Sequence, residues 1–173
     1  MKYFVCSLPK AFIAVLLLIL IVLFGCQSPE TSTKLKPLID SYINAWNTGE
    51  TDVLDEIVHP DFEFRITPTF KATVGLDSLK QLLTYYRTAY PDFHITIDDE
   101  IYAEEKVAII WTITATNTGP GIFPATGKKI DVQGMSVYHF TEGKIFDEWI
   151  AGNHLLWYQQ LGFTLTPPAS FNK

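Results

Sequence analysis

The sequence predicts an α+β domain in which one curved antiparallel β-sheet is covered on a single face by about three N-terminal helices. Two observations support this class. Helical periodicity dominates the first half of the chain, whereas four long segments of alternating apolar and polar residues follow one another in the second half. Helices and strands that segregate in this way form α+β domains, and consecutive alternating segments pair as antiparallel hairpins.

The first predicted helix is amphipathic and is capped by Ser32 or Thr33. Pro37 falls within its first turn, where a missing N–H costs little, and Gly49 ends it. Its apolar residues recur at the i, i+3, i+4 spacing of a single stripe. These residues are Leu35, Leu38, Ile39, Tyr42, Ile43 and Trp46.

Two further helices precede the long strands. A short helix is predicted for residues 51–58 and is stopped by His59-Pro60. Another begins near Asp77 and ends before Pro91. A last helical turn is predicted for residues 154–161. The predicted strands comprise residues 61–69, 94–102, 106–116, 131–140 and 144–153.

The last two strands form a hairpin around Thr141-Glu142-Gly143. We expect a three-residue loop with Gly143 in the left-handed region rather than a two-residue turn, because Glu142 is poorly suited to positive φ. Side chains alternate along a strand, so this loop defines which residues share a face. The face predicted to be functional carries Gln133, Met135, Val137, His139, Asp147, Trp149, Ala151 and Asn153.

Residues 1–25 are predicted to be an export signal rather than part of the fold. Ala11–Gly25 is an uncharged apolar run of 15 residues, shorter than the roughly 20 that a membrane-spanning helix needs. Leu23-Phe24-Gly25-Cys26 resembles the lipobox of bacterial lipoproteins, which implies lipidation of Cys26 and a protein anchored in the cell envelope. An uncleaved anchor helix is the alternative. Residues 26–33 are then a tether, 34–163 the folded domain and 164–173 a loose tail.

Composition excludes several classes of function. With Cys6 in the signal and Cys26 lipidated, no thiol remains in the domain for a disulfide, a metal site or a nucleophile. Removing the two lysines of the signal changes the net charge from −6 to −6 − 2 = −8, which argues against nucleic acid as a partner. No metal-binding or phosphate-binding motif is present, so we expect neither metal nor cofactor.

Seven short motifs, in order along residues 35–163, resemble the SnoaL-like (ester or polyketide cyclase) branch of the nuclear transport factor 2-like superfamily. They are Trp46-Asn47-Thr48-Gly49, His59-Pro60-Asp61-Phe62, Ala89-Tyr90-Pro91-Asp92-Phe93, Pro124-Ala125-Thr126-Gly127-Lys128, Gly143-Lys144-Ile145, Glu148-Trp149 and Gln160-Leu161-Gly162. The resemblance implies a cone-shaped, cystatin-like α+β fold around an apolar pocket. It also implies cofactor-free ring closure by aldol-type condensation, with a carboxylate as acid and base.

The same resemblance identifies candidate site residues. The family's acidic position, seven residues before Gln-Leu-Gly, is Asn153 here, and two family histidines correspond to His139 and Asn117. An amide does not ionise, so Asn153 can only hydrogen-bond a carbonyl. Asp147 is therefore the candidate replacement acid.

Each candidate has a structural alternative. His139 is either a base or a hydrogen-bonded sheet histidine, and Asp147 is either an acid or an exposed strand carboxylate. Pocket walls are predicted from residues that would equally serve as core, namely Trp111, Trp149, Tyr86, Phe93 and Met135. We discount His154, which would point to the opposite face from Asn153.

The sequence therefore predicts a membrane-anchored SnoaL-like domain that binds a small hydrophobic molecule. Whether it turns that molecule over is left open. The alternatives are a ligand-binding module without catalysis and an interaction domain that forms a homodimer through the outer face of its sheet.

Overall fold

A six-stranded sheet organises the computed structural model, which describes residues 29–66 and 71–166. The strand order is β2-β1-β6-β5-β4-β3. The strands are β1 (Val58–Ile66), β2 (Thr73–Val74), β3 (His94–Ala103), β4 (Lys106–Thr116), β5 (Lys129–Thr141) and β6 (Lys144–Gly152). The helices are α2 (Pro29–Thr48), α3 (Leu54–Ile57), α4 (Leu76–Ala89) and α5 (His154–Leu161).

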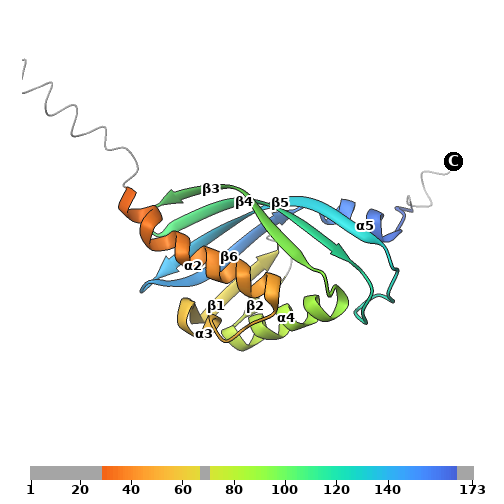
Figure 1. The fold of residues 1–173 in the computed structure, drawn as a ribbon, viewed down its shortest axis with the longest axis horizontal. Helices are drawn as coiled ribbons and strands as arrows, with labels where there is room; N and C mark the ends of the chain where they lie inside the picture. The colour runs from red at the N-terminus through yellow and green to blue at the C-terminus, as the bar shows by residue number, and fades with distance from the viewer. Residues whose placement is uncertain (1–28, 67–70, 167–173) are drawn as a thin grey trace, which may run out of the picture.

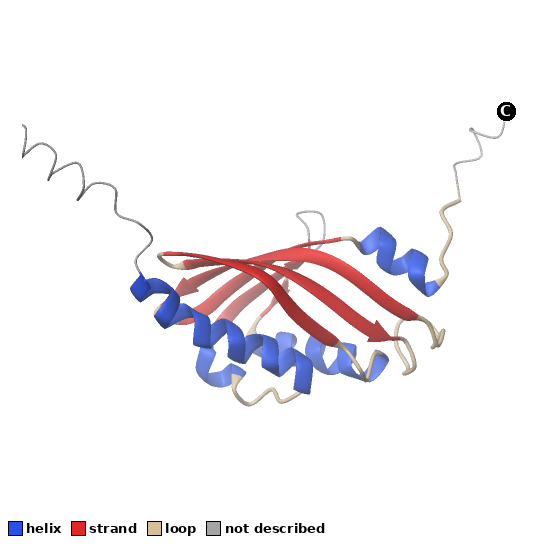
Figure 2. Ribbon diagram, turned by 45° about the horizontal axis from the view of Figure 1, so that its top comes forward, coloured by secondary structure: helices blue, strands red, loops and turns tan. Residues whose placement is uncertain are grey.

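The predicted α+β class is confirmed. Strands β3 to β6 form consecutive antiparallel pairs and curve together over α2 and α4, as Figure 1 shows. Figure 2 shows the same helices on one side of the sheet, with α5 at its far end. The sheet is mixed rather than purely antiparallel, because β1 pairs with β6 in parallel. The short strand β2, which pairs with β1, was not predicted.

Helix α2 confirms the predicted apolar stripe but not the predicted start. It begins at Pro29, inside the segment expected to be a tether, so Pro37 lies within the helix rather than in its first turn. Because Pro37 has no N–H, the helix lacks one backbone hydrogen bond there. The stripe faces the sheet, with Tyr42 and Ile39 fully buried.

The segment after α2 differs from the prediction. Helix α3 is a single turn, and β1 begins at Val58, so His59-Pro60 lies in the strand. A residue that precedes proline is restricted to extended backbone, and this preference at His59 suits the start of a strand as well as the end of a helix. The imidazole Nδ1 of His59 accepts a hydrogen bond from the backbone N–H of Asp61 at 3.1 Å.

The turn between β5 and β6 corrects the predicted loop. It has two residues, Glu142 at φ 54° and Gly143 at φ 76°, and Thr141 pairs with Lys144. An irregularity in β6 shifts the pairing by one residue, so His139 lies opposite Asp147. A two-residue turn with one extra residue preserves the same alternation as a three-residue loop. The predicted residues that lie in β5 and β6 therefore share one face, whereas Asn153 lies beyond the end of β6.

The predicted signal and Cys26 lie outside the described residues. Within the two described ranges, no helix is long and apolar enough to span a membrane.

Candidate functional site

A cavity opens between the inner face of the sheet and the helices. With its open mouth it spans about 630 Å³, much of it open to solvent, and the volume of the cavity itself is about 70 Å³. Its wall comes from α2, α4, α5 and all the long strands, and is mainly apolar. The aromatic side chains of the wall include Trp46, Phe64, Tyr86, Phe93, Trp111 and Trp157.

Glu148 of β6 brings a carboxyl group into this apolar wall. Its side chain is only 3% exposed, and its neighbours on the sheet are Tyr138 of β5 and Phe64 of β1. Three hydroxyl groups donate hydrogen bonds to it: Tyr42 to Oε2 at 2.7 Å, Ser136 to Oε1 at 2.8 Å and Tyr138 to Oε1 at 2.9 Å.

Burial raises the pKa of Glu148 above its ordinary value of 4.5, because the charged form loses its hydration. The hydrogen bonds from Tyr42, Ser136 and Tyr138 oppose this rise, and the negative charge of Asp147 adds to it. Burial also raises the pKa of Tyr42 and Tyr138, so both phenols stay protonated and donate. Glu148 is therefore a carboxyl group that gains a proton more readily than an exposed one.

The hydrogen bonds leave the two carboxylate oxygens unequal. Each oxygen offers about two lone-pair positions. Oε1 accepts from both Ser136 and Tyr138, whereas Oε2 accepts from Tyr42 alone. The acceptor position that these bonds leave open is on Oε2, which is therefore the oxygen available for a further proton.

Three other polar residues line the cavity. Tyr86 contributes a hydroxyl group from α4, and His154 contributes an imidazole from the first turn of α5. His154 was expected to point away from Asn153 on a continuing strand, but β6 ends at Gly152 and both residues line the cavity. Asn153 also lines the cavity, but its side-chain oxygen caps α5 by accepting from the backbone N–H of Leu156 at 3.0 Å.

Three predicted wall residues are found in the wall. Trp111, Tyr86 and Phe93 all line the cavity and are also packed in the hydrophobic core. Trp111 makes a polar contact as well, since its indole Nε1 donates to Ser136 Oγ at 2.9 Å.

The face predicted to be functional is the outer face of the sheet. Met135 is 44% exposed and Trp149 is 42% exposed, and neither lines the cavity. His139 and Asp147 lie on the same outer face, where Nδ1 and Oδ1 are 2.6 Å apart. These residues do share one face of the sheet as predicted, but that face points away from the cavity. The alternation of side chains defines two faces of a strand and does not say which of them is buried.

Asn117 is a buried residue that holds a loop in place rather than part of the cavity wall. It is 2% exposed, lies just after β4 and does not line the cavity. Its side-chain oxygen accepts from the backbone N–H of Thr126 at 2.8 Å, and its amide donates to the Ala89 carbonyl at 3.4 Å. It thus ties the loop before β5 to the end of α4.

The register of β4 would have identified Glu148. Alternate residues of β4 are apolar and buried, from Val107 to Ala115. Val107 pairs with Tyr138, which in turn pairs with Glu148. Following the buried face of β4 across the sheet leads to Glu148, whereas the last hairpin considered alone does not.

No group of three or more His, Cys, Asp or Glu side chains within the described residues could hold a metal ion. The cavity contains one carboxyl group, one imidazole and several hydroxyl groups. This set can transfer a proton and hydrogen-bond a carbonyl oxygen.

The curved sheet, the helices on one side and the apolar cavity together define a cone-shaped pocket domain. The chain belongs to the SnoaL-like polyketide cyclase family, whose model matches residues 36–161. The predicted SnoaL-like domain and its nuclear transport factor 2-like fold are thereby confirmed. No curated protein sequence matches this chain.

Solved structures agree with this fold. A candidate SnoaL-like polyketide cyclase from Jannaschia has a TM-score of 0.72 at 16% identity and covers 83% of this chain and 99% of its own. A candidate polyketide cyclase from Bacillus cereus has a TM-score of 0.66 at 25% identity, covering 80% and 87%. IdmH, a candidate polyketide cyclase from Streptomyces antibioticus, has a TM-score of 0.64 at 19% identity, covering 74% and 98%.

Proposed function

We propose that this domain binds a small, mostly apolar carbonyl compound in its cavity and transfers a proton at the carbon beside the carbonyl, with Glu148 as acid and base. The observation that carries the proposal is a carboxyl group buried among aromatic side chains, with an acceptor position open on Oε2. A carboxylate with a raised pKa is a stronger base than an exposed one and works closer to neutral pH.

The chemistry follows the reaction that family membership suggests. The Glu148 carboxylate removes a proton from the carbon next to a carbonyl, and an enolate forms. The enolate carbon then bonds to a second carbonyl carbon of the same molecule, and the resulting alkoxide takes the proton back from Glu148. Tyr86 and His154 are the groups from which we expect a hydrogen bond to the developing oxyanion.

Deuterium exchange tests the first step without knowledge of the natural substrate. The domain is incubated in D₂O with 2-tetralone, a small apolar ketone, and loss of the α-proton signal is followed by NMR. We expect catalysed exchange in the wild type and a rate at least about 100-fold lower in Glu148→Gln. Asp147→Asn is the matched control, because Asp147 is the adjacent carboxylate on the outer face. Equal rates in wild type and Glu148→Gln would refute the assignment.

Binding without turnover is the second candidate. It is favoured by Asn153, an amide at the family's acidic position that caps α5, and by the three hydroxyl groups already bonded to Glu148. Native mass spectrometry of the wild-type domain should then show a co-purifying apolar molecule. The variant Ile113→Trp narrows the cavity and should no longer bind this molecule. Trp149→Ala, on the outer face, should retain it. A ligand that stays bound in a wild type with no exchange activity would favour this candidate.

Homodimerisation through the outer face is a further part of the proposal. Ile110 of β4 pairs with Met135 of β5, and Trp149 of β6 lies one row away, all three more than 40% exposed. Exposed apolar side chains that cluster on a sheet favour a protein partner. Light scattering should give a dimer mass for the wild type and a monomer mass for Met135→Lys. A monomeric wild type would exclude this arrangement.

We also propose that the domain is held at a membrane through a lipid on Cys26. The apolar run of residues 11–25 and the lipobox-like sequence before Cys26 support this. Expression of the full chain in a bacterium, followed by fractionation, should place the wild type in the membrane and Cys26→Ser outside it. Membrane retention of Cys26→Ser would favour an uncleaved anchor helix.

A further inference from the structure

The indole of Trp111 occupies a space that two glycines leave open on the inner face of the sheet. Trp111, Gly134 and Gly152 lie in one row, because Trp111 pairs with Gly134 and Gly134 pairs with Gly152. A Cβ atom at Gly134 would lie 2.3 Å from Cη2 of the indole, and one at Gly152 would lie 3.2 Å from it. The indole can therefore occupy this position only because Gly134 lacks a side chain, and a side chain at Gly152 would crowd it.

This placement brings the indole N–H to Ser136. Nε1 donates to Ser136 Oγ at 2.9 Å, and Ser136 Oγ in turn donates to Glu148 Oε1 at 2.8 Å. An indole nitrogen can only donate, whereas a hydroxyl group can donate or accept. With Trp111 in place, the serine oxygen already accepts one hydrogen bond, and its single hydrogen is directed to Glu148.

We propose that Trp111 is a positioning residue, which acts through Ser136 to orient a hydrogen-bond donor towards Oε1 of Glu148. This inference rests on the proposed role of Glu148. Oε1 then receives two donors, from Ser136 and Tyr138, and proton exchange is confined to Oε2. Without the indole N–H, the serine hydroxyl can rotate and accept a hydrogen bond from a protonated Glu148, which stabilises the neutral form.

Other titratable groups surround Glu148, and the three variants compared below leave all of them unchanged. Tyr42 faces it from α2 and Tyr138 from β5, while Asp147 is its neighbour on β6. Tyr86 of α4 and His154 of α5 line the same cavity. The hydrogen bond from Ser136 lowers the pKa of Glu148, so any loss of that donor must raise it.

The test measures the titration of Glu148 directly. The domain is labelled with ¹³C at the glutamate carboxyl carbons, the signal of Glu148 is assigned by its absence in Glu148→Gln, and its midpoint is followed by NMR in three variants. Ser136→Ala deletes the donor, Trp111→Phe deletes the indole N–H while keeping an aromatic ring, and Trp157→Phe is the control. Trp157 also lines the cavity, but its N–H donates to the Tyr90 hydroxyl at 3.2 Å.

We expect the midpoint to move upward most in Ser136→Ala, to a smaller extent in Trp111→Phe, and not at all in Trp157→Phe. The pH profile of α-proton exchange should move in the same order. An unchanged midpoint in Trp111→Phe, with a shifted one in Ser136→Ala, would show that the serine needs no orientation by Trp111. A shift of equal size in Trp157→Phe would show a general effect of the cavity wall, and either result overturns the proposal.

The result separates this inference from the proposed function. If the midpoints shift as expected but the wild type exchanges no α-proton, Trp111 positions a carboxyl group that is not catalytic. If α-proton exchange depends on Glu148 but Trp111→Phe leaves the titration midpoint of Glu148 unchanged, Trp111 is not a positioning residue. The proposed role of Glu148 as acid and base then stands.

Discussion

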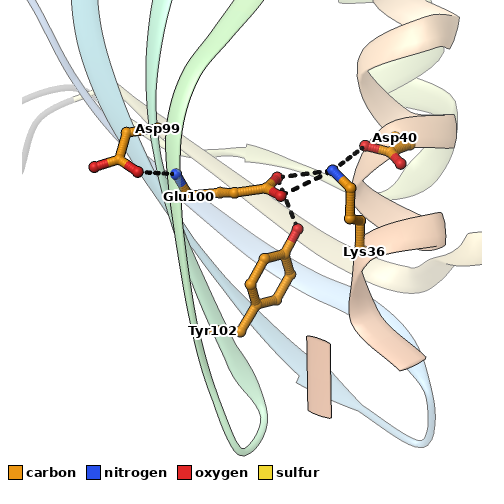
Figure 3. A network of polar contacts seen from close by, with 5 residues as sticks. All are labelled: Lys36, Asp40, Asp99, Glu100 and Tyr102. Atoms are coloured by element: carbon orange, nitrogen blue, oxygen red, sulfur yellow. Dashed lines mark hydrogen bonds and ion pairs between the residues drawn. The ribbon is translucent and has the colours of Figure 1, made fainter. Parts of the chain in front are cut away.

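Glu100 and Glu148 are carboxyl groups of the same chain whose pKa values are shifted in opposite directions. Glu100 lies on β3, where Lys36 of α2 reaches it at 2.8 Å and Tyr102 donates to it at 2.9 Å (Figure 3). Partial burial pushes its pKa upward, but the hydrogen bonds from Lys36 and Tyr102 outweigh that effect, and the pKa is lowered. Glu148 accepts three hydrogen bonds, all from neutral groups, and its pKa is raised.

The number of hydrogen bonds that a carboxyl group accepts therefore does not decide whether its pKa is raised or lowered. What differs is a cation at Glu100 and the depth of burial at Glu148, which removes most of the hydration that would stabilise its charge. The Lys36–Glu100 pair therefore connects α2 to the sheet, whereas at Glu148 the raised pKa is what the proposed proton transfer requires. Lys36 also bonds Asp40 at 3.2 Å, so the pair is part of an exposed network.

Deleting the two carboxyl groups should have unequal effects on stability. Glu148→Ala leaves the hydroxyl groups of Tyr42, Ser136 and Tyr138 buried without their acceptor, and we expect it to lower the free energy of unfolding by about 2–3 kcal/mol. Glu100→Ala should cost about 0.5 kcal/mol, because the ion pair that it removes is solvent-exposed. Urea unfolding measures both. Equal losses would remove the distinction between the two sites.

Opposite pH dependences should follow from the opposite pKa directions. The raised pKa of Glu148 contributes stability that is fully present below 4.5 and is lost as pH rises through the folded-state pKa. The lowered pKa of Glu100 contributes stability that is present above 4.5 and is lost as pH falls through its folded-state pKa. The stability of the wild type relative to Glu148→Gln should therefore decline with rising pH, and relative to Glu100→Gln it should increase. If both stability differences changed with pH in the same direction, the two pKa shifts would not be opposite.

Removing the cation should affect one carboxyl group only. Lys36→Met should raise the pKa of Glu100 and lower stability by less than about 1 kcal/mol at low salt, with a smaller loss at high salt as the pair is screened. The carboxyl signal of Glu148 should not move. NMR titration and urea unfolding at two salt concentrations check both points, and a coupled shift of Glu148 would show that the sites are not independent.

Much of the fold follows from local patterns. The stripe of α2, the four strands from β3 to β6 and the bounds of α5 are all visible in the sequence. The parallel pairing of β1 with β6 is not visible, because it joins segments about 85 residues apart and no turn signals it. The β5–β6 turn was also predicted wrongly. A non-glycine residue disfavours positive φ, which pointed to a longer loop, yet Glu142 adopts φ 54°.

The site was predicted only in part. Trp111, Tyr86 and Phe93 were found because large aromatic residues at buried spacing are either core or wall, and here they are both. Glu148 was missed because Trp149 made the opposite face of β6 look like the inner one. The decisive information was the register with β4, which carries the buried face across three strands.

The most direct test of the central claim is a single NMR titration of the wild-type domain that follows the carboxyl carbons of Glu148 and Glu100 together. We expect a midpoint above 4.5 for Glu148 and below 4.5 for Glu100. A midpoint for Glu148 at or below that of Glu100 would show an ordinary hydrogen-bonded carboxylate, and the proposed acid–base role would then lose its physical basis.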